Sequence, residues 1–103
     1  MINDDVAMVD VGQPLKPQKA KALIKAIRES GGVALSDHAL AELAKDQLES
    51  SDALNVLRAG IVREPEWENG EWRYRVETPR MTIVIAFDSE TELAIVTGWR
   101  NRP

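Results

Sequence analysis

Apolar residues between Pro14 and Ser30 recur at the spacing of a helix. They fall three and four positions apart, which places them on one helical face. The residues of this face are Ala20, Leu23, Ile24 and Ile27. Gly31-Gly32 follows, where glycine is expected to take the left-handed conformation that ends many helices. The pattern predicts an amphipathic helix over residues 14–30.

Two shorter helices are predicted before residue 60. Ser36 offers the hydroxyl of a helix N-cap, and Leu35 and Leu40 have the spacing of a hydrophobic staple. The buried stripe of this second helix is predicted as Leu40, Leu43, Ala44, Gln47 and Leu48. A third helix is predicted from Ser50 or Ser51 to Ala59, and Gly60 would end it. Its inward residues are predicted as Ala53, Val56 and Leu57.

After Gly60 the apolar spacing changes from helical to alternating. Ile61-Val62 begins a strand that Pro65 confines to an edge or an end of the sheet. Asn69-Gly70 predicts a two-residue hairpin in which Trp67 lies opposite Trp72. On the returning strand, one face is expected to carry Trp72, Tyr74 and Val76, and the other Arg73, Arg75 and Glu77.

Residues 81–87 and 93–99 are apolar at odd and even positions alike. This is typical of strands buried on both faces, so we expect them at the centre of the sheet. The order of elements predicts an α+β fold, with N-terminal helices packed on a three- to four-stranded antiparallel sheet. Residues 14–103 would form this single domain. Residues 1–13 would form an acidic arm, either mobile, at a sheet edge, or folded over the arginine strand.

Composition narrows the range of functions. The chain of 103 residues has room for one core, and its lack of cysteine excludes disulfides and thiolate metal sites. Its acidic start lacks the pattern of a signal peptide, and no apolar stretch has membrane-spanning length, so we expect a cytoplasmic protein with no membrane contact. A net charge of −4 disfavours non-specific nucleic-acid binding.

His38, the only histidine, would lie near the second position of the second helix. The helix start favours neutral imidazole, which accepts a proton and therefore suits a general base. The alternative is an ordinary exposed residue at a helix start. Glu42 would add a second metal ligand, but no third is in place, so neither a metal nor another cofactor is expected.

Arginines in the last part of the chain are the second group of candidates. Arg73 and Arg75 would project from one strand face at roughly the spacing of neighbouring phosphates, which suits a phosphate-binding role. The alternative is a solvated face neutralised by Glu66, Glu71 and Glu77.

The segment "VTGWRN" adds three candidates at the end of the last central strand, namely Thr97, Trp99 and Arg100. At such an end a polar or aromatic side chain reaches a cleft at the sheet edge. Trp99 would either stack on a base or close the core.

Residues 33–100 resemble a small uncharacterised bacterial and phage family. The shared features are a Ser/Thr-x-His-Ala helix start, here at His38-Ala39, an Asn-Gly-x-Trp-Arg-Tyr-Arg-Val hairpin, and a closing Ile-Val-Thr-x-Trp/Tyr-Arg strand. That family is similar to the RelE/ParE superfamily of toxin-antitoxin toxins, especially its MqsR and BrnT branches. The resemblance implies a RelE-like domain, with helices packed on a curved antiparallel sheet.

The resemblance also implies a reaction. Ribonuclease toxins of this superfamily cleave mRNA by promoting attack of a 2′-hydroxyl on the adjacent phosphate, without a metal. Carried over to this chain, the catalytic residues would be His38, Arg75 and Arg100. The residues that bind RNA and its phosphates would be Arg73, Tyr74, Thr97 and Trp99. The implied partners are RNA and a cognate antitoxin protein.

Two functions therefore stay open at the level of sequence. One is a metal-independent endoribonuclease of a toxin-antitoxin system. The other is a non-catalytic interaction module that binds a partner protein through its sheet edge or its arginine face. Activity that is lost in a folded His38→Ala variant distinguishes the first from the second.

Overall fold

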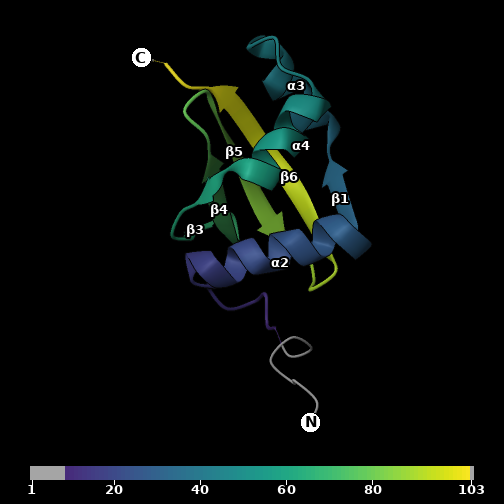
Figure 1. Ribbon diagram of the computed structural model, residues 1–103, viewed down its shortest axis with the longest axis vertical. Helices are drawn as coiled ribbons and strands as arrows, with labels where there is room; N and C mark the ends of the chain where they lie inside the picture. The colour runs from purple at the N-terminus through teal and green to yellow at the C-terminus, as the bar shows by residue number, and fades with distance from the viewer. Residues whose placement is uncertain (1–8, 103) are drawn as a thin grey trace.

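The structure, a computed structural model, describes residues 9–102. Within them, helices cover one face of a single sheet (Figure 1). The helices are α2 (Pro17–Ser30), α3 (Asp37–Lys45) and α4 (Ser50–Ala59). The strands are β1 (Gly32–Leu35), β2 (Ile61–Val62), β3 (Glu66–Glu68), β4 (Glu71–Glu77), β5 (Met81–Phe87) and β6 (Glu92–Arg100). The predicted α+β class is confirmed.

The sheet differs from the prediction in size and direction. Its order is β1-β6-β5-β4-β2, with β3 paired to β4, so residues 9–102 contribute six strands to it rather than three or four. It is mixed rather than antiparallel, because β1 runs parallel to β6. β1 has four residues and its partner lies far along the chain, so neither length nor a hairpin turn marks it in the sequence.

The glycines after α2 have a different role from the one predicted. Gly31 is extended, with φ of −115°, and does not form a left-handed cap. A Cβ at Gly31 would collide with the carbonyl oxygen of Thr91, which accepts a hydrogen bond of 2.9 Å from Gly32 N–H. Glycine is therefore needed because the end of α2 and the start of β1 approach the β5–β6 turn closely.

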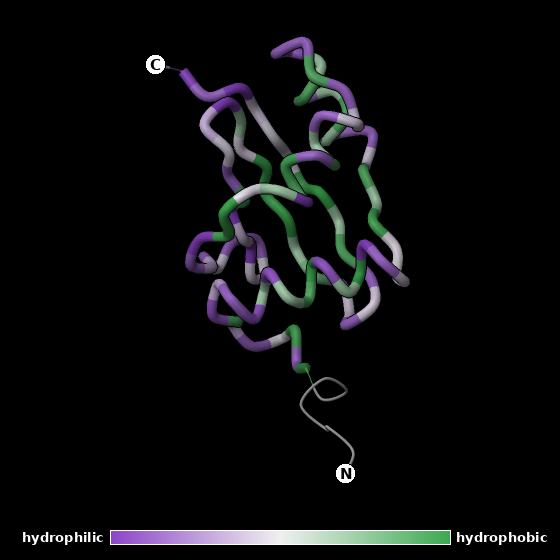
Figure 2. The backbone as a smooth tube through the Cα atoms, viewed as in Figure 1, coloured by the Kyte–Doolittle hydropathy of each residue, from purple (hydrophilic) through white to green (hydrophobic). Residues whose placement is uncertain are grey.

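The predicted hairpin and central strands are confirmed. Asn69 and Gly70 have positive φ values of 51° and 79°, and Trp67 pairs with Trp72. β5 is buried at every position and lies between β4 and β6. The tube in Figure 2 is mostly green along β5 and the first half of β6, whereas purple and green alternate along α2. Hydropathy thus follows the layers of the fold.

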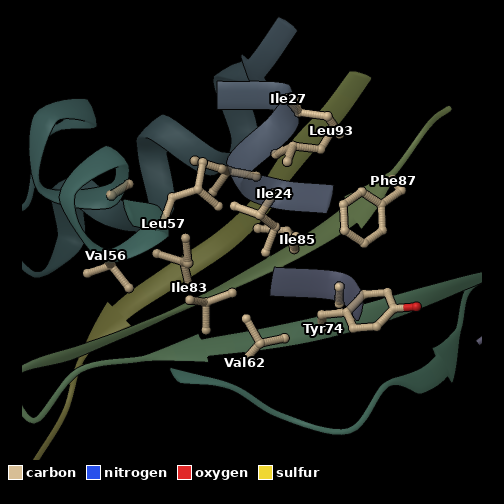
Figure 3. Packing of buried hydrophobic residues seen from close by; sticks show 14 of the residues in the cluster. Ile24, Ile27, Val56, Leu57, Val62, Tyr74, Ile83, Ile85, Phe87 and Leu93 are labelled. Atoms are coloured by element: carbon tan, nitrogen blue, oxygen red, sulfur yellow. The ribbon is translucent and has the colours of Figure 1, made fainter. Parts of the chain in front are cut away.

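The core lies between the helices and the sheet. Figure 3 shows Ile24 and Ile27 of α2 and Leu57 of α4 facing strand residues such as Ile83 and Ile85. The predicted inward faces of α2 and α4 are confirmed.

The predicted stripe of the second helix is wrong in part. α3 buries Ala39 and Leu43, while Leu40 is exposed. The helix ends at Lys45, and Gln47 has a φ of 58°, so the buried Leu48 belongs to the following turn. The five predicted positions therefore do not lie on one continuous helix.

The described end of the N-terminal arm contacts the core. Val9, Val11 and Leu15 pack against the hydrophobic cluster, and Leu15 N–H donates to the Tyr74 hydroxyl at 2.8 Å. This contact lies on the helix-covered side, away from the predicted arginine face. Residues 1–8 of the predicted arm lie outside the described residues.

Candidate binding face on the open side of the sheet

The helices of the described chain leave one face of the sheet uncovered, and we call it the open face. Residues directly opposite each other on neighbouring strands point to the same side, so strand register defines this face. Three rows cross β4, β5 and β6: Glu77, Thr82 and Trp99; Arg75, Val84 and Thr97; and Arg73, Ala86 and Ala94. Four of the seven predicted site residues therefore share the open face.

The middle strand of the open face carries short side chains. Val84 and Ala86 are buried, yet neither belongs to the hydrophobic cluster under the helices. The opposite parity of β5 carries the large residues Met81, Ile83, Ile85 and Phe87, all of which belong to that cluster. A strip of small side chains thus separates the arginines of β4 from Thr97 and Trp99 of β6.

Arg75 reaches across this strip to Trp99. Its Cζ atom lies 5.6 Å from the centroid of the Trp99 ring, within the range of a cation–π interaction. Its Nε atom lies 3.7 Å from a Glu66 carboxylate oxygen, too far for a hydrogen bond. The Arg75 side chain is 51% exposed, so its N–H groups are available to a partner.

Arg73 is held more tightly. Its Nε donates to Glu71 at 2.9 Å and its Nη1 to Glu68 at 3.0 Å, and its side chain is only 17% exposed. Near the end of β4, Arg63 pairs with Glu77 at 2.9 Å. Carboxylates thus occupy much of the arginine strand, which is the neutralised face that the alternative interpretation expects.

Tyr74 does not belong to the open face, which corrects its assignment as an RNA-binding residue. It is 1% exposed, and its ring packs edge-to-face on Phe87 with centroids 5.2 Å apart. In Figure 3 the Tyr74 oxygen points away from the neighbouring core side chains, and it accepts the Leu15 N–H. Burial raises the pKa of the Tyr74 hydroxyl, and this hydrogen bond partly opposes the rise.

Arg100 is separated from Arg75 by the sheet, which contradicts a shared catalytic site in this structure. It pairs in register with Met81, a core residue, so its side chain starts on the helix-covered side. Its Nη2 donates to the Asp46 carbonyl at 3.0 Å, and its backbone N–H donates to Asp46 Oδ2 at 2.8 Å. Arg100 therefore holds the C-terminus of α3, where a positive charge is favourable.

His38 lies on α3, which packs on the helix-covered face. The predicted Ser36 cap holds the start of α3 by accepting the Ala39 N–H at 3.0 Å. The imidazole is exposed and has no hydrogen bond or ion pair within residues 9–102. A hydrogen bond from Lys45 lowers the pKa of Glu42, burial opposes this, and the charges of Lys45 and His38 lower it further. His38 is thus not brought together with the arginines of the open face.

Two further properties concern the described residues alone. No three His, Asp or Glu side chains among residues 9–102 gather into a group that could hold a metal ion. No helix in this part of the chain is both long and apolar enough to cross a membrane.

Comparison with protein-family models, with curated proteins and with solved structures finds no match for this chain. The likeness to the RelE/ParE superfamily therefore stays a prediction from short motifs. The geometry of the open face carries the functional proposal.

One part of the open face was missed at the level of sequence. In β5 the even positions, Thr82, Val84 and Ala86, are smaller than their odd neighbours. A strand that is apolar throughout but uneven in size indicates that one face packs under helices and the other does not. This size alternation is the signal that could have located the strip.

Proposed function

We propose that this protein is a non-catalytic interaction module that binds a partner protein through its open face. The Arg75–Trp99 stack beside the strip of Val84 and Ala86 carries the proposal. Tryptophan and arginine dominate the energetics of protein interfaces. The partly exposed Trp99 ring can pack against an apolar group of a partner, and the N–H groups of the half-exposed Arg75 can bind its carbonyl or carboxylate.

Charge favours a protein over RNA at this face. In the ion pairs of this region, three arginines, Arg63, Arg73 and Arg75, are matched by four glutamates, Glu66, Glu68, Glu71 and Glu77. A phosphate chain would have to displace these carboxylates and would meet a protein of net charge −4. A partner protein that presents one carboxylate or carbonyl group can bind Arg75 alone and leaves the other ion pairs intact.

The test compares two tryptophans. A tagged chain is used to isolate a stoichiometric partner from a lysate of the organism that encodes the protein, and the Kd is measured with purified components. Trp99→Ala removes the aromatic half of the stack and should weaken binding about thirtyfold, since such an anchor contributes about 2 kcal/mol. Trp67→Ala is the matched control, because Trp67 is exposed on β3 and faces away from the open face. Equal binding by Trp99→Ala, or the absence of any partner, contradicts the proposal.

A RelE-like endoribonuclease acting in the cytoplasm is the second candidate. The observation in its favour is the exposed imidazole of His38 at the capped start of α3, which has no hydrogen bond or ion pair to any of residues 9–102. In such a system the protein that covers the open face would be the cognate antitoxin. The wild type is expressed in a bacterial host beside His38→Ala, and growth and total RNA are followed. Growth arrest with RNA cleavage that requires His38 would replace the first proposal; normal growth and intact RNA would dismiss the second.

A further inference from the structure

A second surface lies on the helical side, in the groove between α2 and α4. The groove has a volume of 630 Å³, and an adjoining hollow of 460 Å³ extends it toward β1. The two share Arg28, Leu57 and Arg58, so they form one continuous depression. We call it the basic groove, because its charged lining residues are Lys21, Lys25, Arg28 and Arg58.

The lining of the basic groove is of one sign, although the whole protein is acidic. No carboxylate belongs to the described lining, while the net charge of the chain is −4. Lys25 pairs with Glu29 at 3.1 Å, and both side chains are well exposed, so the pair is weak. Arg58 donates to the neutral Asn55 side chain, and Arg28 has no ion pair within residues 9–102. The positive charge of the groove is therefore largely uncompensated.

The floor of the basic groove is apolar. Ile24 and Leu57 form its base and belong to the core. Leu54 lines the extension toward β1 and is 42% exposed, one of few large apolar side chains that the described chain leaves in solvent. A ligand that complements both the apolar base of the groove and its basic side chains needs an apolar stripe with negative charges beside it.

We propose that the basic groove binds an acidic amphipathic helix of a partner protein. A helix laid between α2 and α4 places its apolar stripe on Leu54 and Leu57 and its carboxylates beside Arg28 and Arg58. Nucleic acid fits less well, because no aromatic side chain is among the described residues that line the groove, and a long polyanion meets the acidic remainder of the protein. The proposal is independent of the open face, which lies on the other side of the sheet.

The test uses three fluorescent peptides of about 16 residues, roughly four helical turns. The first has a leucine stripe flanked by glutamates, the second has the same stripe flanked by lysines, and the third is a scramble of the first without the stripe. Anisotropy titrations against the full chain should give at least tenfold tighter binding of the first peptide than of either other. Equal binding of the first and second peptides, or of the first and third, overturns the proposal.

Two charge reversals locate the site. Arg28→Glu should weaken the acidic peptide at least tenfold. Arg80→Glu makes the same change at an exposed arginine outside the groove and should leave the affinity unchanged. Equal losses from the two variants would overturn the proposal. Single-stranded oligouridine is titrated in parallel, and tighter binding than the peptide, lost in Arg28→Glu, would assign the groove to nucleic acid instead. Circular dichroism confirms that each variant is folded.

Discussion

Tyr74 joins two parts of the molecule that are far apart in the sequence. Its ring packs in the core against Phe87, and its hydroxyl accepts the backbone N–H of Leu15 at 2.8 Å. The hydroxyl thus fixes the chain just before α2 to the middle of β4. Sequence motifs favoured an RNA contact for Tyr74, but its parity in the strand already placed it opposite Arg73 and Arg75. Its structural role follows from that parity.

We predict that Tyr74→Phe lowers the free energy of unfolding at neutral pH by about 1 kcal/mol, because the Leu15 N–H loses its acceptor. Burial raises the pKa of Tyr74 above its usual value of 10.0, so the folded protein keeps the phenol neutral where the unfolded chain ionises. This stabilisation is complete below pH 10 and is lost as the pH rises through the folded-state pKa. The advantage of wild type over Tyr74→Phe should therefore shrink in alkali.

Urea unfolding of both proteins, from neutral pH to above pH 10, measures this difference. Titration of the lysines changes the unfolding free energies of wild type and Tyr74→Phe alike, so a difference between the two proteins reports on Tyr74. Because Tyr74 is the only tyrosine in the chain, the absorbance of phenolate reports its ionisation directly. A difference in unfolding free energy that stays constant across this range would show that the hydroxyl titrates alike in both states.

At the scale of elements, α3 and the end of β6 depend on one close approach. A Cβ at Gly98 would lie 2.9 Å from Leu43 Cδ2 and 3.1 Å from Ile83 Cγ2. Asp46, just after α3, accepts hydrogen bonds from Arg100 and Arg102. α3 is thus seated directly on β6, where a side chain at position 98 would force the Leu43 side chain to shift.

We predict that Gly98→Ala lowers the free energy of unfolding by about 1–3 kcal/mol, because the added methyl group displaces Leu43 from the surface of β6. Urea unfolding of Gly98→Ala, Leu43→Ala and the double variant forms a double-mutant cycle. Removing the Leu43 side chain relieves the crowding, so Gly98→Ala should cost less in the Leu43→Ala background. Additive losses of unfolding free energy would show that the added methyl group collides with atoms other than those of the Leu43 side chain.

Local patterns predicted most of the elements and less of their assembly. The inward face of α2 and the Asn69-Gly70 hairpin follow from spacing and turn chemistry within a few residues. β1 could not be found this way, because it pairs in parallel with a strand about sixty positions away. The basic groove was missed for the same reason, since it exists only once α2 and α4 pack together.

The candidate site shows the same division between local and distant information. The shared face of Arg73 and Arg75 follows from strand alternation and is confirmed. The same rule places Trp99 and Arg100 on opposite faces, so grouping Arg100 with Arg75 conflicted with a pattern already visible in the sequence. The ion pairs of Arg73 with Glu68 and Glu71 depend on side-chain geometry around the hairpin, which no spacing rule supplies.

At the scale of the whole molecule, stability should fall from the centre of the sheet to its edges. β5 is hydrogen-bonded to β4 and β6 and is buried at every position, whereas among the described strands β1 pairs with β6 alone, and β3 is exposed throughout. Local opening exposes little apolar surface at β3 but most of the core at β5. We predict that amide hydrogen exchange is fastest in β3, slower in β1 and slowest in β5, where it requires global unfolding.

Exchange followed by nuclear magnetic resonance at increasing, sub-denaturing urea concentrations checks this order. Amides of β5 should show the urea dependence of global unfolding, and those of β3 almost none, because opening the hairpin exposes little new surface. The exchange rates of the β1 amides are the most informative, because β1 is joined to the sheet through its parallel pairing with β6. If the β1 amides exchange as fast as those of β3, β1 does not unfold cooperatively with the rest of the sheet. If they exchange as slowly as those of β5, the predicted gradient is wrong, and β1 belongs to the same unfolding unit as the central strands.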